Sequence, residues 1–278
     1  MHLKTILIST LLTATTAAMA QDVKGIVQKI RKINEVQYQH VGFAGSESEG
    51  YKHYVSLRDK ATTAQLVALT NDTNAAVACY AGWALVDKYY TDLPGILYTF
   101  LNGKRMVTTF SGCIKSDDYV SSEFYHKYWN SVSEERRAGN KILRAMDSTI
   151  LYNDNSPWLL VTRALEDRTY PEHINKRIEY LAFEKGKINA INYLSGLHKA
   201  AYSPKIKKAL LGYMQKTDFS TTGTTDYYNV VRSLLEFKDP AMNKEIIAKL
   251  KKDKHWEHER SRFITLLGEY SISEDQLK

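Results

Sequence analysis

The chain contains two cysteines, Cys79 and Cys113, which are the residues best suited to covalent chemistry. In an oxidising compartment an even number of cysteines favours a structural disulfide. Two buried free thiols are the alternative, because a thiol packs as a small apolar group. A redox site is the least favoured option, since the sequence has no C-x-x-C motif. We therefore predict a disulfide between Cys79 and Cys113.

Two histidines towards the C-terminal end have the spacing of metal ligands. His255 and His258 would project from one side of a helix, with Glu259 one turn after His255. Zinc accepts such ligands, but the metallopeptidase sequence H-E-x-x-H is absent and no third ligand is fixed nearby. The exposed, charged start of a helix explains the segment better, so we predict no metal ion and no other cofactor.

The segment from Asp117 to His126 carries acidic side chains that calcium or a glycosidase could use. Only Glu123 and His126 have the i, i+3 spacing of one helical face, and Asp118 does not share it. Nothing fixes a second carboxylate at a working distance. Capping of a helix by residues 116–118, followed by a solvated surface, is the preferred interpretation.

Glycines and serines are concentrated between residues 42 and 50, with the sequence GFAGSESEG. A glycine loop before a helix can bind an anion at the helix N-terminus. Glu47 and Glu49 would repel such an anion, so we prefer Ser46 or Ser48 as a helix cap. The G-x-S-x-G, S-x-x-K and P-loop signatures do not occur in the sequence. No catalytic residue is predicted, and the question of catalysis stays open.

The composition predicts helices as the elements that carry these residues. The 278 residues include only 14 glycines and 5 prolines, fewer breakers than a turn-rich β fold needs. The net charge of +7 is concentrated between Pro171 and Arg262, where 18 Lys and Arg face 11 Asp and Glu. That region could face an acidic partner, an anionic glycan or a membrane surface, or carry a solvated surplus of lysine.

The first twenty residues have the pattern of a signal peptide. A short basic start is followed by an apolar and small-residue run from Thr5 to Ala18, and then by the small-x-small cleavage sequence Ala18-Met19-Ala20. A membrane anchor is the alternative, but the run is shorter than the roughly 20 apolar residues that span a bilayer. We expect a signal peptide over 1–20, a helical domain over 21–278, and export to the periplasm or the cell exterior.

Helical spacing of apolar residues recurs along the chain, most clearly between residues 62 and 114. Thr62 or Thr63 can cap a helix that ends at a turn over residues 71–74, and a second helix follows over 75–90. Asp92 can cap a third helix, and residues 106–114 are expected to form the fourth. Upstream, the first helix is expected to end near Gln39, and another resumes over residues 51–59.

These helices pair into a repeat. The strings at residues 66–71 and 77–82 match those at residues 97–102 and 107–112, at offsets of 31 and 30. A period near 30 residues is the size of one helix pair in a solenoid. The segment TTAQLVALTNDTNAAVACYAGWALVD resembles a HEAT-type helical repeat. The resemblance, which covers residues 62–114, implies an all-α superhelix of stacked antiparallel helix pairs, HEAT- or armadillo-like, that acts as a binding scaffold.

The internal alignment also bears on the cysteines. It places Cys113 where Trp83 stands in the preceding unit, four residues after Cys79 on the same helical face. The two cysteines would then lie on facing sides of adjacent helices, where their Cα atoms could approach within the roughly 7 Å that a disulfide needs.

Beyond residue 116 helical segments continue with weaker repetition. The expected helices include residues 116–129, 133–151, 157–166, 171–183, 188–201, 204–214, 225–237, 241–250 and 255–270. The strongest break is the sequence NDNSP at residues 153–157, which is our choice for a boundary within the helical domain.

We predict an exported, non-catalytic scaffold that binds a protein or another macromolecule. The candidate contact residues are the aromatic side chains Tyr119, Phe124, Tyr125, Tyr128 and Trp129, for which core packing is the alternative. A hydrolytic, glycan-acting enzyme on a helical scaffold is the second hypothesis, and it requires converging carboxylates or histidines in a concave pocket. A structural envelope protein is the third. No nucleic-acid partner is expected, because the sequence carries no binding motif.

Overall fold

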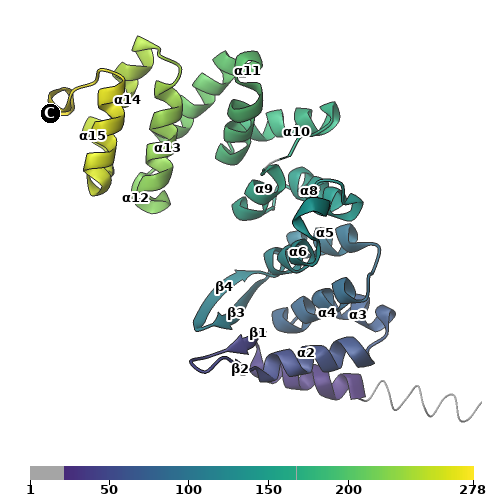
Figure 1. Ribbon diagram of the computed structural model, residues 1–278. Helices are drawn as coiled ribbons and strands as arrows, with labels where there is room; N and C mark the ends of the chain where they lie inside the picture. Colours follow the sequence, from purple (N-terminus) through teal and green to yellow (C-terminus); the bar gives the residue numbers. More distant parts are fainter. Residues whose placement is uncertain (1–21, 167) are drawn as a thin grey trace, which may run out of the picture. The chain divides into compact units, whose positions relative to one another are not determined.

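The computed structural model describes residues 22–166 and 168–278, and Figure 1 labels its helices and strands. The predicted signal peptide lies outside the described residues. The chain divides into two compact units between Ala164 and Leu165, which we call unit 1 and unit 2. The division falls within α9 (Trp158–Leu165), further along the chain than the predicted boundary at residues 153–157.

Unit 1 is built around one apolar helix, α4 (Ala75–Asp87). Every residue from Ala76 to Val86 is buried, because apolar side chains cover the whole circumference of this helix. It packs against α2 (Glu49–Lys60), α3 (Thr63–Leu69) and α6 (Val120–Ser131). The other helices of the unit are residues 22–33, α5 (Leu93–Gly103), α7 (Glu134–Arg137), α8 (Lys141–Tyr152) and most of α9.

The predicted capping residues start three of these helices. Thr62 and Gln65 form a reciprocal capping box at α3, with the Gln65 N–H donating to Thr62 Oγ1 at 3.2 Å and the Thr62 N–H donating to Gln65 Oε1 at 2.8 Å. Asp92 accepts a hydrogen bond from a first-turn N–H of α5 at 3.0 Å. Ser48, one of the two predicted candidates, does the same for α2 at 3.0 Å.

A four-stranded mixed sheet lies beside the helices of unit 1 (Figure 1). Its strands are β1 (Val36–Val41), β2 (Ser46–Glu47), β3 (Met106–Gly112) and β4 (Ile114–Tyr119), in the order β2-β1-β3-β4. The two outer pairs are antiparallel hairpins, whereas β1 and β3 pair in parallel, with Val36 opposite Thr109. The parallel pairing joins two hairpins from distant parts of the sequence.

Because of the sheet, two of the predicted helices are wrong. The first helix does not reach Gln39, and residues 106–114 are not a helix. The run Val107-Thr108-Thr109 is β-branched and favours extended backbone, and Gly112, with φ +54°, lets the chain turn into β4. Residues 77–82 therefore lie in a helix while residues 107–112 lie in a strand, so their alignment is not a structural repeat. The predicted all-α class is supported in its coarse form, because the described residues are mostly helical, and the small mixed sheet is an addition to it.

The sheet is attached to α4 and α2 through Gln37 in β1. The Gln37 N–H donates to Tyr80 Oη at 2.6 Å, and the Tyr80 hydroxyl donates to the Gln37 carbonyl at 3.0 Å. The Gln37 side chain accepts from the Gly50 N–H at 3.0 Å. A Cβ on Gly50 would lie 2.9 Å from both Gln37 Oε1 and Tyr80 Oη, so only glycine lets α2 approach this closely.

Unit 2 consists of helices over the residues that the structure describes. They are α10 (Glu172–Phe183), α11 (Ile188–Lys216), α12 (Phe219–Thr222), α13 (Thr224–Leu235), α14 (Pro240–Lys252), η1 (Lys254–Glu259), α15 (Arg260–Glu269) and η2 (Glu274–Leu277). The Phe219 and Tyr227 rings stack 3.9 Å apart in its core. Pro204, expected to start a new helix, lies inside α11, which is held between α10 and α13.

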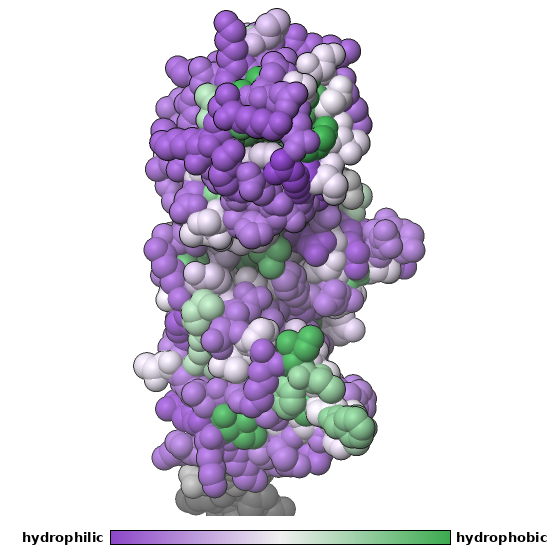
Figure 2. Space-filling model, turned by 90° about the vertical axis from the view of Figure 1, so that its left-hand side faces the viewer, coloured by the Kyte–Doolittle hydropathy of each residue, from purple (hydrophilic) through white to green (hydrophobic). Residues whose placement is uncertain are grey.

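Hydrophilic side chains predominate on the face drawn in Figure 2, and hydrophobic ones form small separate groups. Among the helices that the structure describes, none combines the length and the apolar character needed to cross a bilayer.

Candidate functional site

The candidate site is a groove in unit 1 with a volume of about 650 Å³. It lies where the C-terminal ends of α2, α4 and α6 meet the segment that leads into α8. Its polar lining comes from Arg58, Asp87, Arg136 and Asn140, and aromatic and apolar walls come from Tyr89, Tyr90, Leu93, Tyr128 and Ile142. The groove thus combines both kinds of surface that a specific binding site needs.

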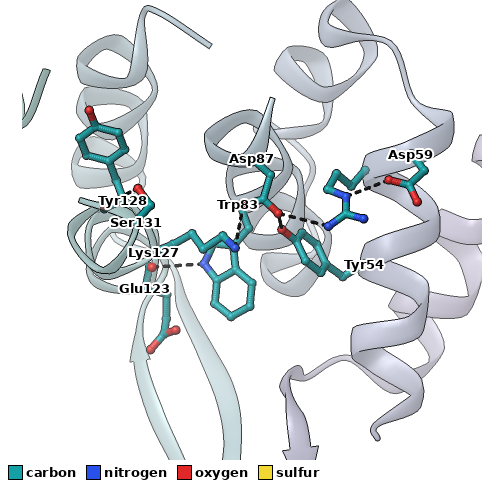
Figure 3. A network of polar contacts seen from close by, with 9 residues as sticks. Tyr54, Asp59, Trp83, Asp87, Glu123, Lys127, Tyr128 and Ser131 are labelled. Atoms are coloured by element: carbon teal, nitrogen blue, oxygen red, sulfur yellow. Dashed lines mark hydrogen bonds and ion pairs between the residues drawn. The ribbon is translucent and has the colours of Figure 1, made fainter. Parts of the chain in front are cut away.

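Asp87, the last residue of α4, is the charged centre of the groove. Lys127 Nζ lies 2.8 Å from Asp87 Oδ1, Arg58 Nη1 lies 3.5 Å from Oδ2, and the Tyr54 hydroxyl donates to Oδ2 (Figure 3). A carboxylate at a helix C-terminus is unfavourable by itself, because the helix dipole is negative there. Two cations and a hydroxyl from neighbouring helices compensate for it.

An aromatic cluster supports these polar groups from the core. Tyr54 is fully buried, its ring stacks on Tyr80 at 5.4 Å, and it meets Trp83 edge-on at 5.7 Å. The Lys127 ammonium lies 5.5 Å from the Tyr54 ring centre and 5.7 Å from that of Trp83, within cation–π range. Burial, and then the Asp87 carboxylate, raise the pKa of Tyr54. The hydroxyl therefore stays protonated and donates to Asp87.

Glu123, a member of the acidic segment found in the sequence, is buried beside this cluster and does not line the groove. Its carboxylate accepts a hydrogen bond from the Tyr38 hydroxyl at 2.8 Å and points away from Asp87 (Figure 3). Trp83 Nε1 donates to the Glu123 backbone carbonyl at 3.2 Å. Burial raises the pKa of Glu123, the Tyr38 hydrogen bond opposes this, and the negative charge of Asp118 adds to it.

The rest of that segment is arranged differently from the prediction. Asp117 and Asp118 lie in β4 rather than at the start of a helix, and Asp117 accepts from Thr108 Oγ1 at 2.7 Å. Burial lowers the pKa of His126, while Asp118 acts in the opposite direction. Asp118, Glu123 and His126 are therefore electrostatically coupled, but none of them lines the groove.

Of the five aromatic residues predicted to contact a partner, some lie in the core and the others keep part of their surface exposed. Phe124 and Tyr125 are fully buried, so their prediction as contact residues is wrong. Phe124 packs edge-on against Phe100 at 5.2 Å, and the Tyr125 hydroxyl donates to Asp147 Oδ1 at 2.7 Å. The helical spacing could not distinguish these outcomes, because α6 has one face towards α4 and another towards solvent.

The other three aromatic residues keep some exposure. Tyr128 lines the groove, and its hydroxyl donates to Asn140 Oδ1 at 3.0 Å. Trp129 is partly exposed, with the guanidinium groups of Arg137 and Arg163 at 4.4 and 5.1 Å from its ring centre. Tyr119 is 36% exposed at the end of β4, away from the groove lining. Of the five, only Tyr128 belongs to the candidate site.

The predicted disulfide is not formed, and both cysteines are free. Cys79 is buried in α4, whereas Cys113 is exposed in the turn between β3 and β4. The prediction placed Cys113 on a helix facing α4, and that helix is in fact the β3–β4 hairpin. Burial raises the pKa of the Cys79 thiol well above its ordinary value, so the thiol is inert in the folded chain.

His255 and His258 lie in η1 with their ring centres 4.8 Å apart. Over the described residues, no group of three or more His, Cys, Asp or Glu side chains is placed to hold a metal ion. In the glycine-rich segment, Ser48 caps α2 and Glu47 ends β2.

Sequence reasoning missed the charged centre of the groove. Arg58, Asp87 and Lys127 are far apart in the chain and belong to three different helices. Each occupies an ordinary position for a surface charge near a helix end. The signal that could have found them is the aromatic content of α2 and α4, which predicts a cluster that a nearby cation could contact.

Comparison with known proteins adds no assignment to this geometry, because no family model, no curated protein and no solved structure matches the chain. The site alone therefore supports the functional conclusion.

Proposed function

We propose that this protein is an exported, non-catalytic, mostly helical scaffold that binds a segment of another protein in the unit-1 groove. Tyrosine and arginine are the residue types that supply most of the binding energy in protein interfaces, and both line this groove. Its central carboxylate is already compensated by Lys127 and Arg58. Recognition would therefore depend on shape and aromatic contact rather than on net charge.

The conformation of Tyr89 is the single observation that carries the proposal. This residue follows α4 in the left-handed region, with φ +55°, and its side chain is 89% exposed on the groove rim. The Tyr90 N–H donates to the Leu85 carbonyl and the Tyr89 N–H to the Val86 carbonyl, both at 3.0 Å, which is a Schellman ending that favours glycine. A large, exposed aromatic at a strained position is best explained by contact with a partner.

The enzyme alternative receives less support. Hydrolysis of a glycan needs two carboxyl groups that converge on a substrate. Asp87 is engaged by three neighbours, and Glu123 lies outside the groove lining. The geometry therefore favours binding over hydrolysis.

The test replaces Tyr89 by glycine. Tyr89→Gly should raise the free energy of unfolding by about 0.5 to 1 kcal/mol, because it removes left-handed strain without removing a buried contact. The matched control is Lys104→Gly, which changes another left-handed residue, φ +48°, outside the groove. It should raise stability by a similar amount.

Binding of the partner protein is detected by photo-crosslinking in the native host. A photoreactive phenylalanine analogue at Tyr90, in the groove wall, should give a discrete protein adduct, whereas the same analogue at exposed Tyr98 should not. Tyr89→Gly should abolish the adduct and Lys104→Gly should preserve it. Equal adducts at both positions, no adduct at either, or an adduct unaffected by Tyr89→Gly would each contradict the proposal.

Export is tested separately. The mature protein, recovered from the periplasm or the medium, should begin at Gln21 when its N-terminal peptide is identified by mass spectrometry. Recovery of the intact N-terminus from the cytoplasm would refute this part of the proposal.

A further inference from the structure

Unit 2 contains a second groove, with a volume of about 780 Å³, along α10 and the C-terminal half of α11. Its lining includes five lysines and two glutamates, so positive charge is in excess. The lysines are Lys176, Lys185, Lys205, Lys208 and Lys216, and the glutamates are Glu179 and Glu184. This groove is separate from the unit-1 groove and has a different chemical character.

One face of α11 forms much of the groove. Lys205, Lys208, Gly212 and Lys216 follow the helical spacing of one face, so the lysines extend along about 16 Å of helix. Gly212 has no side chain, and a Cβ placed there would meet nothing within 4 Å. The row of α11 lysines is therefore interrupted by an open position at Gly212, which leaves room for an extended chain beside Lys208 and Lys216.

The lysines of this face are available for a ligand. In the described part of the chain, Lys208 and Lys216 form no ion pair, and Lys205 lies over the Phe183 ring at 5.6 Å. Lys207, on the opposite side of the same helix, is instead paired with Asp239 at 2.8 Å. The unpaired charges are thus concentrated on the groove side of α11, where they attract an anion.

The acidic and aromatic groups in the groove restrict the kind of anion. Glu179 accepts from the Tyr202 hydroxyl at 2.7 Å, and the Glu184 side chain is exposed at the end of α10. These carboxylates would repel a densely charged chain such as nucleic acid or polyglutamate, but they can accept hydrogen bonds from sugar hydroxyls. Tyr180, 37% exposed, and Tyr213 add amphipathic ring surface. A flat bilayer would not enter a groove between two helices.

We propose that this groove binds an acidic polysaccharide, with lysines contacting its carboxylate or sulfate groups and glutamates accepting from its hydroxyls. The ammonium of lysine acts as a point charge, which suits single anionic groups spaced along a sugar chain. This site does not depend on the unit-1 groove, so either proposal can fail without the other.

The main experiment compares two triple charge reversals in the purified protein. Lys205→Glu with Lys208→Glu and Lys216→Glu changes the groove, and Lys244→Glu with Lys251→Glu and Lys252→Glu makes the same charge change on exposed positions of α14. Binding to polygalacturonate and to chondroitin sulfate is measured by calorimetry, with circular dichroism as the check of folding. The groove variant should lose at least about tenfold in affinity and the α14 variant less than about threefold. Equal losses would overturn the proposal.

A second variant blocks the groove without changing its charge. Gly212→Leu places a side chain at this open position and also improves helix propensity, so the variant should fold. It should weaken polysaccharide binding by at least about fivefold. Unchanged affinity would show that the ligand does not occupy the groove.

The choice of ligand class is tested with other probes. Neutral dextran, poly-L-glutamate, and vesicles of equal parts phosphatidylcholine and phosphatidylglycerol should each bind more weakly than the acidic polysaccharides. Preference for polygalacturonate over chondroitin sulfate, or the reverse, identifies which anionic group is recognised, and either outcome supports the proposal. Tighter binding of polyglutamate or of vesicles, or no polysaccharide binding at all, would refute it.

Discussion

The two grooves of this protein differ in whether their charged side chains are paired. In the unit-1 groove, Asp87 is compensated by Lys127 and Arg58, which come from other helices of the same unit. In the unit-2 groove, Lys208 and Lys216 have no ion-pair partner among the described residues. Where the charges of a groove are paired, a ligand gains little from its own charge and must fit by shape and aromatic contact. Where lysines are unpaired, they attract an anion over a distance that becomes shorter as the salt concentration rises. One mostly helical chain thus carries two grooves whose charged side chains are arranged in unlike ways.

The largest expected effect comes from removing the aromatic support beneath the unit-1 groove. Trp83→Ala should lower the free energy of unfolding by about 3 to 5 kcal/mol, because a buried indole and its contacts with Tyr54 and Lys127 are lost. Urea denaturation measures the loss. The control Trp158→Ala changes a tryptophan that is 69% exposed, and it should cost less than about 1 kcal/mol. Equal losses would show that the aromatic cluster does not hold the groove.

A double-mutant cycle on the charged centre tests the compensation itself. Asp87→Asn and Lys127→Met should be coupled by about 1 to 2 kcal/mol, because both side chains are mostly shielded, at 23% and 25% exposure. The comparison pair is Lys199–Glu236 in unit 2, 3.0 Å apart and more exposed at 37% and 44%. Its coupling should stay below about 0.5 kcal/mol. Similar coupling energies in the two cycles would show that the Asp87–Lys127 pair is no stronger than an exposed surface ion pair.

The buried carboxyl beside the unit-1 groove gives a smaller, pH-dependent effect. Burial raises the pKa of Glu123 in the folded chain above its unfolded value, so the fold favours the protonated form. Stability is fully present below the unfolded pKa and decreases as the pH rises through the folded pKa. Glu123→Gln should remove this decrease, so the free energy of unfolding of the variant should rise relative to that of the natural chain as the pH increases above the ordinary pKa of a glutamate.

Tyr38→Phe provides the opposing control for that measurement. It deletes the hydrogen bond that stabilises the charged carboxylate, so the decrease in stability with rising pH should become steeper. The stability of both variants is measured by thermal unfolding at a series of pH values. Parallel profiles for the natural chain and Glu123→Gln would contradict the assignment.

The smallest effect on stability concerns the cysteines. Cys113 should react with a thiol reagent in the folded protein, whereas Cys79 should react only after denaturation, because it is buried and its pKa is raised. Cys113→Ser should leave the free energy of unfolding within about 0.5 kcal/mol of the natural chain. A folded protein with no reactive thiol would restore the disulfide prediction.

Helices whose start signals are local can be predicted from the residues around them. Apolar spacing and caps at Ser48, Thr62 and Asp92 specify where α2, α3 and α5 begin, because a capping side chain acts within three residues of its own position. The scarcity of glycine and proline correctly predicted a mostly helical chain. The surplus of lysine in the C-terminal half is likewise a property of the sequence.

Features that depend on partners far away in the chain follow from packing and have no local signal. β1 forms because Val36 pairs with Thr109, and no local pattern reports a partner that far away in the chain. The assignment of Phe124 to the core and Tyr128 to the groove follows from which side of α6 meets α4. The charged centre exists because the ends of α2, α4 and α6 converge on Asp87. Capping and periodicity act over one or two turns, whereas pairing and burial are set by packing across the whole unit.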